Sequence, residues 1–510
     1  MKRPGLLAAL AAVAGVGAAL DYGAPDPESQ APLAVGGKRR LVSSELLQDA
    51  ISGEKLFARA KELYEIAKLG EEEYNRPTRV IGSEGHLGTL LYIHSALADL
   101  GDYYNLSSQS FPAVVGNVFE SRLVIADRLA ESAEPMSLTP PTEYREPVSG
   151  DVVLVENDGC DLTDYPAHVR GNIALVRRGT CSFGKKSGNA GKSGAVAAVI
   201  YNHESGTVHG TLGQPSPDHV ATFGLSREEA DGVIARLRRG ESVDATAFVD
   251  AEVKTVETHN LVAQTAAGDP ENCVMLGGHS DSVADGPGIN DDGSGSLSLV
   301  EVAAQLARFD VRNCVRFAWW AAEEEGLLGS DFYVASLSPE ENRRIRVFMD
   351  FDMLASPNFA YQVYNATNDA HPVGSQELRD LYVRWYEARG LPYTFIPFDG
   401  RSDYDGFIRH GIPAGGIATG AEGVKTEEEA ALFGGRAGEW YDPCYHQLCD
   451  DLSNVNVTAW EINTKLVAHA VAHFAVSFEG FPERSDAVVA DDGAGTYGQR
   501  VRYHGSRLFV

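Results

Sequence analysis

Three short apolar segments in the second half of the chain each end at a residue that can bind a metal ion. Residues 273–278 (CVMLGG), 314–322 (CVRFAWWAA) and 346–351 (RVFMDF) are followed at once by His279, Glu323 and Asp352. Runs this rich in Val, Phe and Trp are typical of strands that are buried on both faces. Strand and helix patterns alternate over residues 257–480, which predicts a parallel α/β sheet. Because ligands bind beyond the carboxyl ends of such strands, we expect the three polar side chains to meet in one site.

Three further segments carry side chains of the same chemical type. They are HSDS (279–282), GINDDGSG (288–295), which directly precedes a predicted helix, and DPCYHQLCD (442–450), in which a histidine lies between two cysteines. Together with the strand ends, these segments give the candidate ligands His279, Asp281, Asp291, Asp292, Glu323, Glu324, Glu325, Asp352 and His446.

The ligand types indicate a zinc site with two ions. Histidine and carboxylates without clustered cysteines exclude a structural zinc finger. Two histidines and three carboxylates suit two zinc ions, because three carboxylates and one bridging hydroxide balance the four positive charges. Such ions lower the pKa of bound water from about 15.7 toward 7. A separate carboxylate must then carry the water proton to the leaving amine. One glutamate of 323–325 can do this while a neighbour binds metal, and the residues alone do not show which.

At these residues the chain resembles the di-zinc aminopeptidases of metallopeptidase family twenty-eight. Within that family it is similar to the group of aminopeptidase Y and the secreted fungal leucine aminopeptidases. The segments that carry the resemblance are GGHSDSV, GINDDGSGS, RFAWWAAEEEGLLGS, FDMLASPN, GRSDYDGF and DPCYHQLCD, which span 277–450. The resemblance implies a mixed, mainly parallel α/β sheet flanked by helices, with two Zn²⁺ per chain.

The resemblance also implies a role for individual residues. His279 and Asp352 would bind one zinc ion, Glu324 and His446 would bind the other, and Asp291 would bridge the two. The remaining implied roles are the general base for Glu323, a hydrogen bond to the oxyanion for Tyr445, the substrate pocket for Met353, Gly400 and Arg401, and a carboxylate that orients His279 for Asp281.

Residues 130–256 differ from their surroundings in their many glycines and short β-like runs. The stretch IALVRRGTCSFGKKSGNAGKSGAVAAVIYN (173–202) resembles a protease-associated domain, inserted as in those enzymes. The expected organisation is a signal peptide (1–19), a leader or pro-segment (20–40), a split zinc peptidase domain (41–129 and 257–480), the insert (130–256) and a flexible tail (481–510).

Several features indicate export from the cytoplasm. Lys2 and Arg3 precede an apolar run from Gly5 to Leu20, typical of a signal peptide, with a signal anchor as the alternative. The basic cluster at 38–40 is either a processing site or a solvated patch. Glycosylation sequons begin at Asn105, Asn365 and Asn456. We expect a secreted protein, with the vacuolar lumen as the second choice.

An oxidising compartment permits disulfides among the six cysteines. Local spacing favours the pairs Cys160–Cys181 and Cys444–Cys449. Cys273 and Cys314 each open a β-like run, so they either meet on neighbouring strands or remain buried free thiols.

The expected function is that of a secreted aminopeptidase that removes Leu or another apolar residue from the N-terminus of peptides. The net charge of −29 repels phosphate and argues against a nucleic-acid partner. We expect a monomer with no lasting membrane span. Three alternatives remain: a non-catalytic receptor on the same plan, a one-zinc glutaminyl cyclase, and a carboxypeptidase in which Arg401 meets the substrate carboxylate.

Overall fold

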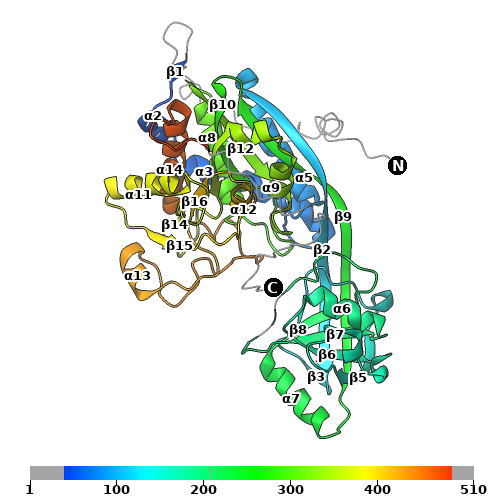
Figure 1. Ribbon diagram of the computed structural model, residues 1–510. Coiled ribbons are helices and arrows are strands. Elements are labelled where there is room, and N and C mark those ends of the chain that lie inside the picture. Colours follow the sequence, from blue (N-terminus) through cyan, green and yellow to red (C-terminus); the bar gives the residue numbers. More distant parts are fainter. Residues whose placement is uncertain (1–38, 207, 209, 485–510) are drawn as a thin grey trace.

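The computed structural model describes residues 39–206, 208 and 210–484, and it consists of a larger and a smaller body joined by two long strands (Figure 1). The predicted signal peptide, nearly all of the leader and most of the predicted tail lie outside the described residues. Among the described residues, none of the helices combines the length and the hydrophobicity that a membrane span requires.

A mixed sheet forms the centre of the larger body. Its core consists of four parallel neighbours in the order β16–β13–β10–β12. Antiparallel pairing continues the sheet on both sides, through β9 next to β12 and β14 next to β16. The strands are β9 (Asp244–Thr265), β10 (Asp269–His279), β12 (Asn313–Trp320), β13 (Ile345–Phe351), β14 (Gln362–Tyr364), β15 (Thr394–Ile396) and β16 (Ala414–Ala418). The prediction of a mixed, mainly parallel α/β sheet is confirmed.

Both faces of this sheet are covered, which explains why the strand segments are mostly apolar. Along β12, Phe317 and Trp319 pack into one core while Ala318 and Trp320 pack into another. The first core is filled by α2 (Ser44–Asp49), α3 (Gly53–Ala67), α5 (Glu84–Ala98), α8 (Gly293–Leu306), α11 (Ser375–Ala388) and α14 (Val457–Val476). The second core is filled by α9 (Leu328–Ser336) and α12 (Tyr404–Arg409). Successive strand residues point to opposite faces, so period-two alternation sorts them into the two cores.

The smaller body is an insert whose own sheet continues that of the larger body. Strands β5 (Val148–Leu154), β6 (Ile173–Arg177), β7 (Ala197–Tyr201) and β8 (Thr222–Leu225) lie parallel, with α6 (Phe183–Lys192) and α7 (Arg227–Arg238) beside them. β2 (Tyr104–Ile125) and β9 are 22 residues long each, pair antiparallel along almost their whole length and run through both bodies (Figure 1). The domain limits at 130 and 256 stay a proposal, because these strands belong to both units.

All six cysteines form disulfides, in the pairs Cys160–Cys181, Cys273–Cys314 and Cys444–Cys449. The two pairs predicted from local spacing are confirmed. The third pair meets because β10 and β12 are neighbours in the sheet, which settles the alternative that the sequence left open.

The three predicted glycosylation asparagines occupy different environments. Asn105 on β2 and Asn365 after β14 are exposed. Asn456 is half-buried and caps α14, with its side-chain oxygen accepting the amide of Ala459 at 3.1 Å. Glycosylation at these positions remains a proposal, and Asn456 is the least accessible of the three.

Candidate metal centre

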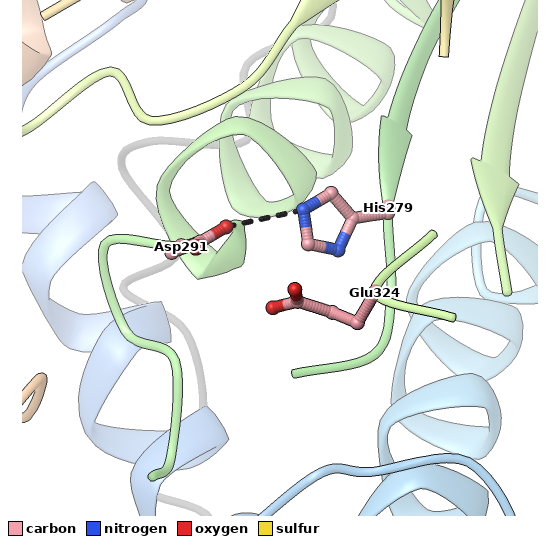
Figure 2. Close-up of side chains that lie close together, drawn as sticks. All are labelled: His279, Asp291 and Glu324. Atoms are coloured by element: carbon pink, nitrogen blue, oxygen red, sulfur yellow. Dashed lines mark ion pairs between the residues drawn. The ribbon is translucent and has the colours of Figure 1, made fainter. Parts of the chain in front are cut away.

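The carboxyl ends of the central strands bring the predicted ligands together. His279 is the last residue of β10, Glu323 follows the end of β12 by three residues, and Asp352 comes directly after β13. Asp291 lies just before α8 and points toward the His279 ring, with Glu324 beside them (Figure 2). Three parallel strands and one helix start therefore position these side chains from well-packed elements.

Asp291 lies between the two histidines. Its Oδ1 is 3.2 Å from Nε2 of His279, and its Oδ2 is 3.1 Å from Nε2 of His446. On the His279 side, Asp352 Oδ1 is 3.7 Å from the same nitrogen. On the His446 side, Glu324 Oε2 is 3.1 Å away. The side chains thus form two groups of one histidine and two carboxylates, which share Asp291.

The donor atoms fit bound cations better than hydrogen bonding alone. Nε2 of His279 and Oδ1 of Asp352 are buried without a hydrogen bond of acceptable geometry. Nδ1 of His279 lies 3.2 Å from the main-chain oxygen of Asp281, and an N–H directed at this oxygen leaves Nε2 as the lone-pair donor. Imidazole nitrogens with carboxylate oxygens are common zinc ligands.

The negative charge of the clustered carboxylates also favours the binding of cations. Burial would lower the pKa of His279, but Glu323, Asp291 and Asp352 raise it well above its usual value. The pKa of His446 is raised in the same sense by Glu324 and Asp291, against the effect of burial. Both histidine rings therefore lie in a strongly negative environment, in which a divalent ion can supply the balancing positive charge.

Asp292 lies within reach of His279 and Asp352 but serves another purpose. Its oxygens accept the main-chain N–H groups of His279 (3.0 Å), Gly295 (2.8 Å) and Met353 (3.1 Å). A carboxylate engaged by three amides has little capacity left for a metal. Asp292 therefore fixes the ends of β10 and β13 to the start of α8.

Two further residues hold the ligands in place and were not predicted as site residues. Asp450 accepts the main-chain N–H groups of Asn290 (2.9 Å) and Asp291 (3.1 Å). The hydroxyl of Ser402 donates to Oδ2 of Asp352 at 3.1 Å. Both residues lie inside segments that the sequence singles out, DPCYHQLCD and GRSDYDGF. Their contacts depend on the fold, which brings these segments next to the strand ends.

Glu323 and Asp281 both lie close to His279 but belong to neither group of proposed ligands. Oε2 of Glu323 is 4.0 Å from Nε2 of His279, and the side chain is 4% exposed. Burial raises the pKa of Glu323 well above its usual value, and Asp403 and Glu324 act in the same direction. The Asp281 carboxylate accepts the amides of Glu323 (3.3 Å) and Glu324 (3.4 Å), and Oδ1 lies 3.8 Å from Nδ1 of His279.

The Cys444–Cys449 disulfide closes the short loop that carries Tyr445 and His446. His446 adopts a left-handed backbone conformation (φ 58°). The Tyr445 ring stacks on the His446 ring with their centres 3.8 Å apart. The loop therefore holds His446 against Asp291 and Glu324, with the Tyr445 ring stacked on the imidazole.

The predicted pocket residues lie next to this group. Met353 is buried and adjoins Asp352. The amides of Gly400 and Arg401 both donate to the Tyr404 hydroxyl, at 2.9 and 3.2 Å. The Arg401 guanidinium donates to Glu422 at 2.9 Å. The 400–401 turn lies close to Asp352 because the next residue, Ser402, donates a hydrogen bond to that carboxylate.

His86 on α5 gives a testable prediction about stability near the site. Its Nε2 lies 3.0 Å from the Ser280 hydroxyl. Burial, and next the nearby Arg79 cation, lower the pKa of His86 to about 3. An unfolded histidine titrates near 6.5, so between these values the unfolded chain binds a proton that the folded chain does not. We expect the free energy of unfolding to fall by roughly 1–2 kcal/mol from pH 6.5 to pH 5 for this reason.

Urea denaturation of wild type and His86→Gln at several pH values measures this effect. The variant should lose part of the acid dependence between pH 6.5 and pH 5, whatever its absolute stability. An acid dependence as steep as that of the wild type would contradict the prediction.

The fold and the site together are those of a metal-dependent hydrolase, with histidines and carboxylates of metal-ligand type gathered at the carboxyl edge of an α/β sheet. Comparison with known proteins makes this specific. Residues 260–471 match the model of peptidase family M28, and residues 148–232 match the PA domain. Aminopeptidase Y of Saccharomyces cerevisiae is 48% identical over 87% of this chain and 82% of its own length. Leucine aminopeptidase 2 of Trichophyton equinum is 41% identical over 87% and 88%.

Solved structures agree with these sequence matches. The aminopeptidase from Aneurinibacillus sp. strain AM-1 superimposes with a TM-score of 0.67 at 28% identity, covering 87% of this chain and 98% of that one. A zinc aminopeptidase from Bacillus subtilis shares the fold, with a TM-score of 0.60 at 23% identity over 86% and 98%. The chain therefore belongs to peptidase family M28 and carries a PA domain. Its enzyme class is that of the zinc-dependent aminopeptidases, which confirms the resemblance seen in the sequence.

Proposed function

We propose that this chain is a secreted di-zinc aminopeptidase that removes Leu or another apolar residue from the N-terminus of peptides. The observation that carries the two-ion proposal is the position of Asp291, whose oxygens lie 3.2 and 3.1 Å from the two histidine nitrogens. His279 and Asp352 would hold one ion with Asp291, and His446 and Glu324 would hold the other. When bound, the ions would polarise the scissile carbonyl and lower the pKa of a water molecule.

Glu323 is the proposed general base. Its carboxylate would accept a proton from the water and return it to the nitrogen of the leaving amine. Burial and neighbouring carboxylates raise the pKa of this group, so it can hold a proton between the two transfers. Asp281 would keep Glu323 and Glu324 in place through their amides.

The other groups of the site would bind the substrate. The free ammonium group would lie between Glu323 and Asp352, which supply negative charge. The Tyr445 hydroxyl would donate a hydrogen bond to the developing oxyanion. Met353 and the turn at Gly400 and Arg401 would contact the N-terminal side chain, and the buried Met353 supports an apolar preference.

The pairing of all six cysteines supports secretion, since disulfides persist in oxidising compartments. The vacuolar lumen is the alternative compartment. A monomer is the proposed state of assembly. Arg401 would have to bind a substrate carboxylate in a carboxypeptidase, but its guanidinium is engaged by Glu422 and lies 3.7 Å from Asp399. These contacts argue against that alternative.

Three substrates test the proposal. The purified protein should release p-nitroaniline from leucine p-nitroanilide, and a zinc chelator should abolish the release. N-acetyl-leucine p-nitroanilide should not be cleaved, because it lacks the free ammonium group. Release of the C-terminal residue from an N-acetylated peptide would instead indicate a carboxypeptidase. A zinc content near one ion per chain would contradict the di-zinc site.

A further inference from the structure

Arg79 is a fully buried arginine beneath the proposed metal centre. It lies in the segment between α4 (Glu71–Tyr74) and α5, ahead of the insert and outside the region that matches the peptidase family model. Its side chain is 0% exposed. The segment packs against residues 280–290, which connect His279 to Asp291 and are called the ligand loop below.

The guanidinium of Arg79 donates to main-chain carbonyls at both ends of the ligand loop. Nη1 donates to Ser280 at 2.5 Å, next to His279. Nε donates to Pro287 at 2.8 Å and Nη2 to Gly288 at 2.5 Å, close to Asp291. The main-chain N–H of Arg79 donates to the Ser282 hydroxyl at 2.9 Å. One side chain thus connects the two ends of the loop that carries a terminal ligand and the bridging ligand.

The loop is shaped around this guanidinium. Gly288 has a left-handed backbone (φ 61°), and a Cβ atom there would lie 2.8 Å from Nη2 of Arg79 and 2.2 Å from the main-chain oxygen of Asp291. Any larger residue would clash with the Asp291 main chain, with Ser282 and with the Arg79 guanidinium. The absence of a side chain at residue 288 thus allows the loop main chain to pack directly against the guanidinium.

Burial of the Arg79 charge lowers the stability of the fold, which favours a role for the charge beyond packing. Arg79 forms no ion pair among the residues that the structure describes, and its acceptors are neutral carbonyls. Moving an unpaired charge out of water costs several kcal/mol, which charge-assisted hydrogen bonds repay only in part. Four carboxylates, Asp281, Asp292, Asp450 and Asp291, act on the guanidinium electrostatically from a greater distance. The charge therefore lies close to the bridging ligand Asp291 and to three carboxylates that hold the ligand-bearing segments.

We propose that Arg79 is a positioning residue for the metal centre, which sets the spacing of His279 and Asp291 by fixing both ends of the ligand loop. This inference rests on the proposed di-zinc site. The planar fork of arginine can reach separated carbonyls at once, whereas the single ammonium of lysine cannot. A variant that keeps the charge but loses the fork therefore separates positioning from electrostatic balance.

Zinc binding by Arg79→Lys tests the proposal, measured by competition with a chromophoric chelator. We expect zinc affinity to fall about 10–100-fold, as is typical when groups that orient metal ligands are changed. In the zinc-loaded enzyme, kcat should fall more than KM rises. Arg346→Lys is the matched control, since Arg346 is 6% exposed at the opposite end of β13 and donates to Asn272 and Pro482. The control should lower the melting temperature without weakening zinc binding.

The outcomes distinguish this inference from the proposed function. Wild type should bind two zinc ions per chain, and failure to do so would overturn the di-zinc site itself. If wild type binds two ions and Arg79→Lys binds them equally tightly, only the role of Arg79 is overturned. If Arg79→Lys does not fold, Ser282→Ala decides, because it removes the hydrogen bond from the Arg79 main chain to the ligand loop and leaves the buried charge in place. Zinc affinity several-fold lower supports the proposal, and unchanged affinity overturns it.

Discussion

Replacing Glu323 by Gln is expected to lower kcat for leucine p-nitroanilide by about 10²–10⁴-fold, the usual contribution of a general base. The amide cannot accept the proton of the attacking water. Gln has nearly the same shape, so the main-chain contact between residue 323 and Asp281 should persist. Zinc content should therefore stay at the wild-type value. Steady-state kinetics and a zinc assay on the same preparation measure both quantities.

Glu325→Gln is the matched control for this prediction. Glu325 belongs to the same glutamate run, and its Oε2 is buried without a hydrogen-bond partner. It is not among the groups to which we assign proton transfer, so its replacement should change kcat less than tenfold. If Glu323→Gln retains full activity, or if Glu325→Gln proves the more damaging change, the assignment of the base is wrong.

Replacing Asp291 by Ala is expected to remove both zinc ions, because this carboxylate is the one shared by the two groups of ligands. Activity should fall to the level of the chelator-treated enzyme, by more than about 10³-fold. Metal ions stabilise the transition state by several kcal/mol, and each 1.36 kcal/mol corresponds to a factor of ten. Zinc content after dialysis against buffer and kcat at saturating substrate measure the two effects.

His446→Ala provides the comparison. His446 belongs to only one of the two groups, together with Glu324. We expect this variant to keep close to one zinc ion, held by His279, Asp291 and Asp352. A similar zinc content in both variants would show that Asp291 does not bridge two ions.

The strand ends were predictable because a local pattern determines them. The segments at 273–278, 314–322 and 346–351 carry mostly apolar residues on both faces, which is typical of buried strands, and the chain order placed helices between them. The long pairing of β2 with β9 was not predictable in the same way. Alternation at 108–126 indicates a strand, but its length and its partner depend on contacts between residues more than a hundred positions apart.

The residues of the site likewise fall into a group that the sequence predicts and a group that it does not. Side chains that would bind metal directly have a recognisable type and spacing, and the resemblance to M28 enzymes assigns them roles. Asp292, Asp450 and Arg79 instead act on main-chain amides and carbonyls. Every residue carries such groups, so no sequence pattern shows which of them will need a partner. Only the fold shows that these three polar side chains are directed at the ligand-bearing segments.

The shared strand β9 has a consequence for engineering this chain. β9 leaves the insert, enters the larger body and there pairs with β12 from Arg316 to Trp319. A truncation that removed the whole of residues 130–256 would delete about half of β9. The part of β2 that pairs with it would then become an unpaired strand edge, which is prone to aggregation. A variant without the insert should instead join β2 to β9 by a tight hairpin turn partway along the paired strands. The remaining part of β2 would then still pair with β9, and β9 with β12.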